Sequence, residues 1–460
     1  MIVSDLPAHF ATIDARRDEF VQRLCAYLAH PSISAHGEGI AEVAALLVAQ
    51  LQGMGFDARS IATAGWPMVY GRRDDAPGKP TILFYGHYDV QPPDPLDAWL
   101  SPPFAPTIRD GRIFARGAGD NKGQHFAQLL ALEVLLAAQE RLPCNVIVVL
   151  EGEEEVGSPH IAHFVREQRA LLDADLVVTA DGPMHASGRA ILEFGVRGVA
   201  SFELRARGAQ RDLHSGNFGG VAPNPLWTLV HLLATMKDAN GTITIDGFHD
   251  HIVPPSDLER AALAALPLDL PQVMADLGLA QLDVPIERGY YERLMLYPTL
   301  TINGLHGGYG GTGSKTVLPS AAVAKCDIRL VANQRVDDIL AKVAAHVQRH
   351  APGVEFIAYG GMDPSKTPMD SPFAAILERA ITAGQGEAPL LVPAMGGSLP
   401  EYVWTKILGV PAFVVPYANF DEANHAPNEN IVIDCFIRGI KTGVAIMTYL
   451  GAEARPSGCP

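Results

Sequence analysis

Apolar positions in the first half of the chain follow two alternating patterns. Apolar residues recur at helical spacing in four segments, at 12–30, 39–54, 121–139 and 158–172. Runs rich in apolar and β-branched residues end abruptly in polar residues at 81–90, 144–155 and 173–182. Alternation of this kind predicts an α/β fold, with a mostly parallel sheet that helices cover on both faces.

The pattern changes near residue 197. Residues 199–208 alternate as a half-exposed strand does, and 321–333 do so over their second half. A helical pattern at 336–350 and a strand pattern at 354–360 follow. These elements predict a smaller α+β domain, and we expect the proline-rich segment 252–300 to be an elaboration on it.

The buried-strand pattern of the first domain returns at 411–416. We therefore expect one α/β domain made of residues 1–196 and 364–460, interrupted by an inserted domain at 197–363. A chain of 460 residues fits this division, because single hydrophobic cores stop growing at about 250–300 residues.

Charge and cysteine content narrow the classes of partner. A net charge of −16 argues against nucleic-acid binding, which depends on clustered Lys and Arg. No stretch reaches the ~18 apolar residues of a membrane span, and the N-terminus lacks a basic region followed by an apolar one. The five cysteines lie far apart without a CxxC pair, which indicates reduced thiols and a cytoplasmic protein without a membrane partner.

Polar residues gather where the predicted strands end. They are His87, Asp89, Asp120, Glu153, Glu154, Glu155, Asp181 and, far along the chain, His425. In α/β sheets ligands bind beyond the carboxyl ends of the strands. Imidazoles and carboxylates at one sheet edge make a nitrogen and oxygen site suited to zinc, cobalt or manganese. The acidic stretch EGEEEVGS at 151–158 is then either a solvated loop or the side of a cation site.

The polar residues belong to motifs that span nearly the whole chain in a fixed order. The motifs are GHYDV, RGAGDNKG, EGEEEVGS, ADG, LHSGNFGG, GSKTVLP, DIRLVAN, GGSLPE and NHAPNE. The sequence resembles the dinuclear zinc exopeptidase family, which includes carnosinase and related cytosolic dipeptidases, carboxypeptidase G, aminoacylase, acetylornithine deacetylase and succinyl-diaminopimelate desuccinylase. The stretch 85–106 and the long insert look most like the dipeptidase branch.

The resemblance implies a site for two divalent ions in each subunit, expected to be zinc, with manganese or cobalt as alternatives. The implied ligands are His87 and Asp181 for one ion, Glu155 and His425 for the other, and Asp120 as a bridge. In this family the peptide bond after the bridging aspartate is typically cis, and here it joins Asp120 to Asn121. Asn121 replaces an acidic residue of many relatives, without an expected loss of metal.

The resemblance also implies catalytic roles. Glu154 would be the general base, and Asp89 would orient His87 from behind. His214 would stabilise the oxyanion in the partner subunit's site, as in dimeric relatives, so a homodimer is expected. Glu151 and Glu153 receive only a solvated or hydrogen-bonding role.

Substrate contacts are implied on both domains. Arg329 matches the family arginine that binds the substrate's C-terminal carboxylate, a task suited to a guanidinium. The glycine-rich stretches 301–316 and 396–401 would line the pocket. Within and beside them, His306, Thr312 and Ser398 are further candidate contacts.

These inferences predict metal-dependent hydrolysis of an amide or peptide bond in a small substrate with a free C-terminal carboxylate. A dipeptidase or carboxypeptidase-like exopeptidase fits first, and a deacylase or deacetylase of N-acyl amino acids is the alternative that the same ligands allow. A non-catalytic binding protein is a further alternative, against which Glu154 argues because binding needs no base. The insert is expected to act as a lid with hinges near 196–199 and 360–364.

Overall fold

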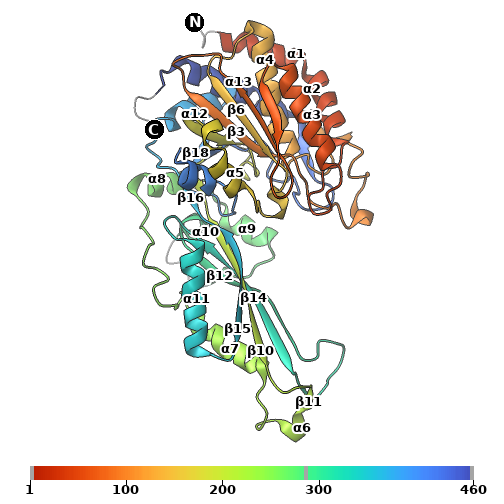
Figure 1. The fold of residues 1–460 in the computed structure, drawn as a ribbon, viewed down its shortest axis with the longest axis vertical. Coiled ribbons are helices and arrows are strands. Elements are labelled where there is room, and N and C mark those ends of the chain that lie inside the picture. The colour runs from red at the N-terminus through yellow and green to blue at the C-terminus, as the bar shows by residue number, and fades with distance from the viewer. Residues whose placement is uncertain (1–4, 284–288, 456–460) are drawn as a thin grey trace.

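An eight-stranded, mostly parallel sheet forms the centre of the larger part of the molecule (Figure 1). The computed structural model describes residues 5–283 and 289–455. In sheet order the strands are β1 (Asp57–Ile61), β2 (Met68–Arg73), β6 (Asn145–Glu151), β3 (Thr81–His87), β7 (Leu176–Thr179), β18 (Ala412–Val414), β8 (Ile191–Glu193) and β17 (Leu390–Val392). The central strands β6, β3, β7 and β18 pair in parallel, so their carboxyl ends meet at one edge.

Successive residues of a strand point to opposite sides of this sheet. Both sides therefore carry core residues, and helices cover both faces. Ile82 and Phe84 of β3 belong to one core cluster, whereas Leu83 and Tyr85 belong to another on the opposite face. The first cluster includes residues of α1 (Leu6–Ala15), α2 (Arg17–Leu28), α3 (Ile40–Gly53), α4 (Lys122–Gln139), α12 (Ala374–Gln385) and α13 (Ile433–Ala452). The second includes α5 (Ile161–Glu167) and Trp404. The predicted α/β fold class is confirmed.

The helix expected at 12–30 is two helices. The chain bends between α1 and α2 at Arg16, whose guanidinium donates to Glu19 and to Glu133 of α4. The ion pair with Glu133 attaches the bend to the neighbouring helix.

A second sheet, antiparallel and four-stranded, lies at the other end of the molecule (Figure 1). Its order is β12 (Thr299–Gly307), β14 (Ala321–Leu330), β10 (Gly198–Arg207) and β15 (Glu355–Met362). Helices α7 (Pro225–Met236) and α11 (Val336–His350) supply apolar residues to its core cluster. Asn224 begins α7 by accepting from the backbone N–H of Leu226, with proline at the first helical position.

The segment between these two sheets differs from the sequence-based expectation. Helices α8 (Asp257–Ala265), α9 (Leu270–Asp276) and α10 (Tyr290–Leu296) lie between the two parts in Figure 1. The apolar side chains Leu266 and Met295 cluster with Ile191, Leu390 and Val392 of the eight-stranded sheet. The expected elaboration on the inserted domain therefore packs on β8 and β17, because the exposed edge of a sheet is stabilised by a covering element. We call the described residues 257–283 and 289–296 the edge strap.

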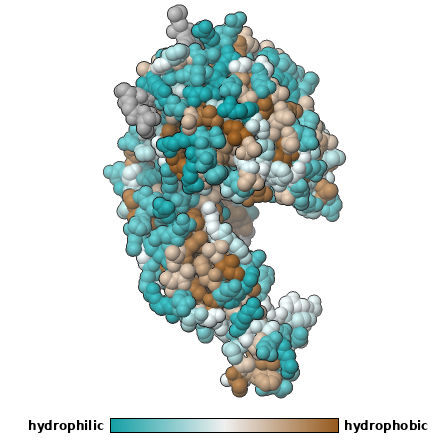
Figure 2. Space-filling view, in the orientation of Figure 1, coloured by the Kyte–Doolittle hydropathy of each residue, from teal (hydrophilic) through white to brown (hydrophobic). Residues whose placement is uncertain are grey.

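Figure 2 shows a broad upper body and a slender lower part joined by a narrow waist. Near the waist β9 (Gly195–Val196) pairs with β16 (Ser365–Lys366), and just beyond it Val199 of β10 pairs with Met362 of β15. The two chain segments expected as hinges therefore run side by side.

The structure describes four of the cysteines and most of the predicted helices. The four described cysteines, Cys25, Cys144, Cys326 and Cys435, are free, and Cys459 lies outside the described residues. None of the helices in the described part of the chain combines the length and apolar character that crossing a membrane requires.

The packing of the edge strap predicts that Leu266→Ala lowers the free energy of unfolding by about 2–5 kcal/mol, because a buried leucine leaves a cavity. Urea denaturation of the full chain measures this loss. Leu268→Ala is the matched control, since Leu268 is 41% exposed and should change stability by less than about 0.5 kcal/mol. Equal effects of the two substitutions would show that the strap does not pack on β17.

Candidate metal centre

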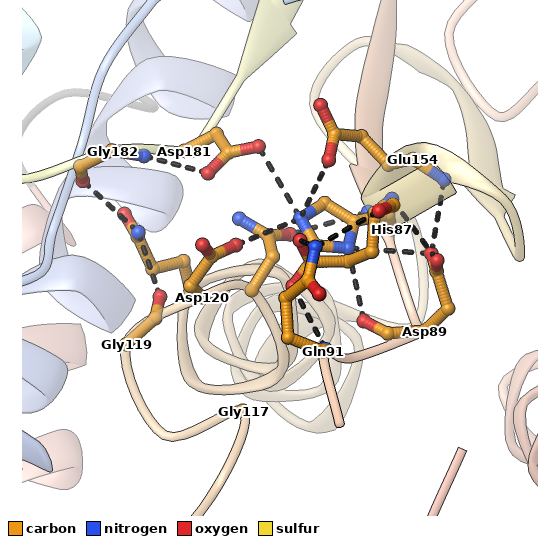
Figure 3. A network of polar contacts seen from close by, with 12 residues as sticks. His87, Asp89, Gln91, Gly117, Gly119, Asp120, Glu154, Asp181 and Gly182 are labelled. Carbon is orange, nitrogen blue, oxygen red and sulfur yellow. Dashed lines mark hydrogen bonds and ion pairs between the residues drawn. The ribbon is translucent and has the colours of Figure 1, made fainter. Parts of the chain in front are cut away.

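His87 occupies the carboxyl end of β3 and is fully buried. Its Nδ1 lies 3.0 Å from the carbonyl oxygen of Asp89, an acceptor, so this nitrogen carries the proton. The other ring nitrogen, Nε2, is 3.0 Å from Asp120 and 3.5 Å from Asp181 (Figure 3). Nε2, which faces two carboxylates, is thus the atom that His87 offers to a cation.

Asp120 connects two groups of potential metal ligands. Its Oδ1 faces His87, and its Oδ2 lies 3.1 Å from Nε2 of His425. The first group is His87, Asp120 and Asp181, and the second is Asp120, Glu155 and His425; within each, the ligand atoms lie within 4.8 Å of one another. The structure therefore brings together all five residues expected as ligands. The peptide bond from Asp120 to Asn121 is cis, as expected.

Glu155 and His425 form the outer side of this arrangement. Gln91 holds the Glu155 carboxylate, donating from its backbone N–H at 3.2 Å and from Nε2 at 3.0 Å. His425 Nε2 lies 3.1 Å from Glu155, and its side chain is 56% exposed. This side of the site is therefore open to solvent, and a substrate can approach from it.

Asp89 acts in two directions, as Figure 3 shows. Its backbone carbonyl orients His87, as noted above, whereas its buried carboxylate accepts from the backbone N–H groups of Glu154 at 3.2 Å and Glu155 at 3.1 Å. One side chain thus fixes the short 3₁₀ turn that carries both glutamates. The sequence indicated the contact with His87 but gave no sign of the second one.

Asn121 joins the ends of two neighbouring strands. Its Oδ1 accepts from the backbone N–H of His87 at 3.2 Å, and its Nδ2 donates to the carbonyl of Ala180. Asp181, the next residue, accepts from Gly182 through Oδ1. The amide side chain therefore positions two potential ligands without offering a charge of its own.

Glu429 is a structural residue of the site that the sequence reasoning missed. Its buried carboxylate pairs with Arg116 at 2.7 Å and accepts from the backbone N–H groups of Gly117, Gly119 and Asp120 at 3.0–3.1 Å. It thereby shapes the loop that presents Asp120. Glu429 is the last residue of the motif NHAPNE, and Arg116 is the first residue of RGAGDNKG. The opposite charges of these two motif residues were the sequence signal from which their ion pair could have been predicted.

Two further glutamates of EGEEEVGS are buried, not solvated. Glu151 accepts from the hydroxyls of Tyr85 at 2.7 Å and Ser158 at 3.2 Å, and burial raises the pKa of its carboxyl to about 8. Glu153 contacts His160 Nδ1 at 2.7 Å. Of the two roles expected for Glu151 and Glu153, solvated or hydrogen-bonding, both residues therefore have the hydrogen-bonding one.

Negative charge is crowded in the centre. Burial raises the pKa of Glu154 well above its ordinary value, and the carboxylates of Asp181, Glu155 and Asp120 raise it further. Burial, with Asp120 beside it, raises the pKa of Glu155 to about 7. Hydrogen bonds that His425 donates to the carboxylates of Asp120 and Glu155 raise its pKa to about 10. Each shift has the direction that additional positive charge at this point would relieve.

The donor set fits divalent cations. Oδ2 of Asp181 is buried without a hydrogen-bond partner, although it points toward His87 Nε2 (Figure 3). A buried unpaired carboxylate oxygen is costly, and a metal ion satisfies it. Imidazole nitrogens and carboxylate oxygens without cysteine suit zinc, manganese or cobalt at an open site, not a closed structural zinc.

The expected substrate contacts separate into two groups. Arg329, on β14, donates from a terminal nitrogen to the hydroxyl of Ser398 at 2.8 Å, so these two meet. His214 lies on β11 (Leu213–His214), at the tip of the insert farthest from the metal centre (Figure 1). His306 and Thr312 are exposed on β12 and the loop after it. Among the described residues, these last three do not join the ligand groups of their own chain.

Comparisons with known proteins agree with this geometry. The chain is 29% identical to Cys-Gly metallodipeptidase dug1 of Schizosaccharomyces pombe over 94% of this chain and 95% of that protein. It is 28% identical to Beta-Ala-His dipeptidase of Homo sapiens over 94% of this chain and 90% of that protein. Both relatives cover the catalytic motifs and the insert alike.

Solved structures resemble the whole fold. An M20 family metallo-carboxypeptidase, Sso-CP2 of Sulfolobus solfataricus, is 33% identical with a TM-score of 0.88, over 95% of this chain and all of that one. The sequence profile described as peptidase family M20/M25/M40 matches residues 83–449, which contain all five potential ligands and both carboxylates that support them. The chain belongs to peptidase family M20/M25/M40.

Proposed function

We propose that this protein is a metal-dependent dipeptidase, which hydrolyses the peptide bond of small substrates that have a free C-terminal carboxylate. The observation that carries the proposal is Asp120, whose two oxygens face two separate ligand groups with Glu154 beside them. The names of the relatives in fission yeast and humans support a dipeptide substrate.

We assign the metal ligands as two zinc sites that share one carboxylate. His87 and Asp181 would hold one ion and Glu155 and His425 the other, and Asp120, which belongs to both ligand groups, would contribute to both. When bound, the two ions would polarise the scissile carbonyl and make a water molecule acidic.

Glu154 is the proposed base. Its Oε2 lies 4.0 Å from His87 Nε2, on the same side as the other potential ligands (Figure 3), and Asp89 fixes its backbone. Oε2 takes a proton from the attacking water and returns it to the leaving amine. A carboxyl whose pKa burial raises is suited to holding that proton between the two steps.

Arg329 is the proposed anchor for the substrate carboxylate. A guanidinium can bind a carboxylate through two parallel hydrogen bonds, and the hydroxyl of Ser398 lies beside it. Arg329 belongs to the four-stranded sheet, whereas Ser398 follows β17 of the eight-stranded one. We therefore assign residues 197–363 as a lid domain and residues 1–196 and 364–460 as the catalytic domain, although the edge strap packs on the latter.

We also infer a homodimer. His214 is exposed at the far tip of the insert, where a second copy of the chain could receive it as the oxyanion-stabilising group. Exposed apolar residues of the same region, Val221 and Trp227, would be covered by that copy. His306 and Thr312 then contact the substrate across the subunits. Free thiols support a cytoplasmic location.

A substrate panel tests the reaction. The metal-loaded protein should release both amino acids from dipeptides, while the matching N-acetyl amino acids are poor substrates. Amidation of the C-terminus of the same dipeptide should lower kcat/KM by at least about tenfold, because Arg329 loses a charged partner. Preferential hydrolysis of N-acetyl amino acids would instead identify a deacylase.

Removal of the base isolates its role. Glu154→Gln should lower kcat by about 10²–10⁴-fold, because the amide cannot accept the proton of the water. Elemental analysis should still find two metal ions per chain, as in the parent protein. Glu153→Gln is the control, since Glu153 contacts His160 and not the metal centre, and it should keep turnover. Unchanged turnover of Glu154→Gln with metal bound would assign the base elsewhere.

Mixed dimers test the shared site. Dimers of His214→Ala with Glu154→Gln chains should regain activity at one of their two sites, where an intact Glu154 meets an intact His214 of the partner. Each variant alone should be weak, by about 10²–10³-fold for His214→Ala. Activity of the mixture that only averages the two separate variants would show that His214 does not act across subunits.

A further inference from the structure

A cavity of about 100 Å³ lies at the waist of the molecule, away from the metal centre. Its walls come from segments 196–197, 253–259, 295–296, 331–333 and 365–366 and from Ala394. The lining of the cavity therefore comes from both ends of the insert, from both ends of the edge strap and from the part of the molecule that contains the eight-stranded sheet. The space is large enough for several waters or a small ion.

Arg197 places in this wall a positive charge that forms no salt bridge among the described residues. Its side chain is buried, its Nε donates to the carbonyl of Gly396 at 2.8 Å and its Nη1 to the carbonyl of Tyr297 at 3.3 Å. Within residues 5–283 and 289–455 it forms no ion pair with a carboxylate. A buried charge without a counter-charge is costly.

The other charges near Arg197 do not balance it. Lys366 and Glu259 both line the cavity but pair with each other. Burial lowers the pKa of Arg197 to about 10, the neighbouring guanidinium of Arg329 lowers it further, and the carboxylate of Asp327, which pairs with Arg329, raises it. The cavity therefore keeps one net positive charge, with Ser365 and Asn333 as additional polar groups in its lining.

We propose that this cavity binds a small carboxylate anion, which pairs with Arg197. The site goes beyond the peptidase reaction, because none of its lining residues belongs to the metal centre. It would nevertheless be linked to substrate binding. Arg197 donates to the carbonyl of Gly396, and Ser398, two residues later, accepts from Arg329. A ligand on Arg197 would therefore affect the position of the loop that connects the two arginines.

Thermal unfolding of the metal-loaded full chain in sodium acetate tests the proposal, with sodium chloride at equal ionic strength as the reference. Acetate should raise the unfolding midpoint saturably, by about 2 °C at ten times its Kd. Arg197→Met should lose this shift. Arg189→Met should keep it, since Arg189 lies outside the cavity lining and pairs with Glu387. The readout is stability, so the result is independent of turnover.

A second pair of variants covers the possibility that Arg197→Met does not fold. Ala332→Leu fills the cavity while leaving Arg197 in place, and should also abolish the acetate shift. Arg197→Lys keeps the charge and should retain part of the shift. The proposal is overturned if acetate stabilises the parent no more than chloride does, or if Ala332→Leu responds to acetate as the parent does.

Discussion

Crowded negative charge is the constraint on which the centre of this molecule depends. Asp120, Asp181, Glu154 and Glu155 share a small buried space with only two imidazoles. Burial first, and then the repulsion between like charges, opposes ionisation and raises the pKa values of Glu154 and Glu155. The fold keeps these groups together at the carboxyl ends of parallel strands, and cations turn the arrangement from a cost into a reactive site.

Two more carboxylates position the potential ligands. Their own negative charges are stabilised by neighbouring backbone N–H groups and, for one of them, by an arginine. Asp89 accepts two backbone N–H groups of the turn that carries Glu154 and Glu155. Glu429 accepts three backbone N–H groups around Asp120 and pairs with Arg116. Hydrogen bonds of this kind favour the charged form of a carboxylate. The acidic residues thus divide by partner: Asp89 and Glu429 face backbone groups and shape the loops, whereas Asp120, Asp181 and Glu155 face one another as candidate metal ligands.

The sequence predicts the features that arise from local patterns along the chain better than the contacts between segments that lie far apart in it. Strand and helix alternation gave the large sheet, and the polar residues at strand ends, such as His87, lie together as the topology requires. The contacts of Glu429 and the docking of the edge strap on β17 arise between segments far apart in the chain, which periodicity does not record. The position of His214 could likewise not be predicted from periodicity, because no pattern in the neighbouring sequence relates the tip of the insert to a metal centre.

The edge strap also changes how the insert is connected. Without it, the polypeptide would pass between the two sheets twice, through the paired segments near Val196 and Ser365. Because Leu266 and Met295 of the strap pack on β8 and β17, further connections between the two parts flank α8 and α10. A body attached by several connections has fewer ways to rotate freely than one attached by two. We expect the insert to move about the waist with these connections bending together.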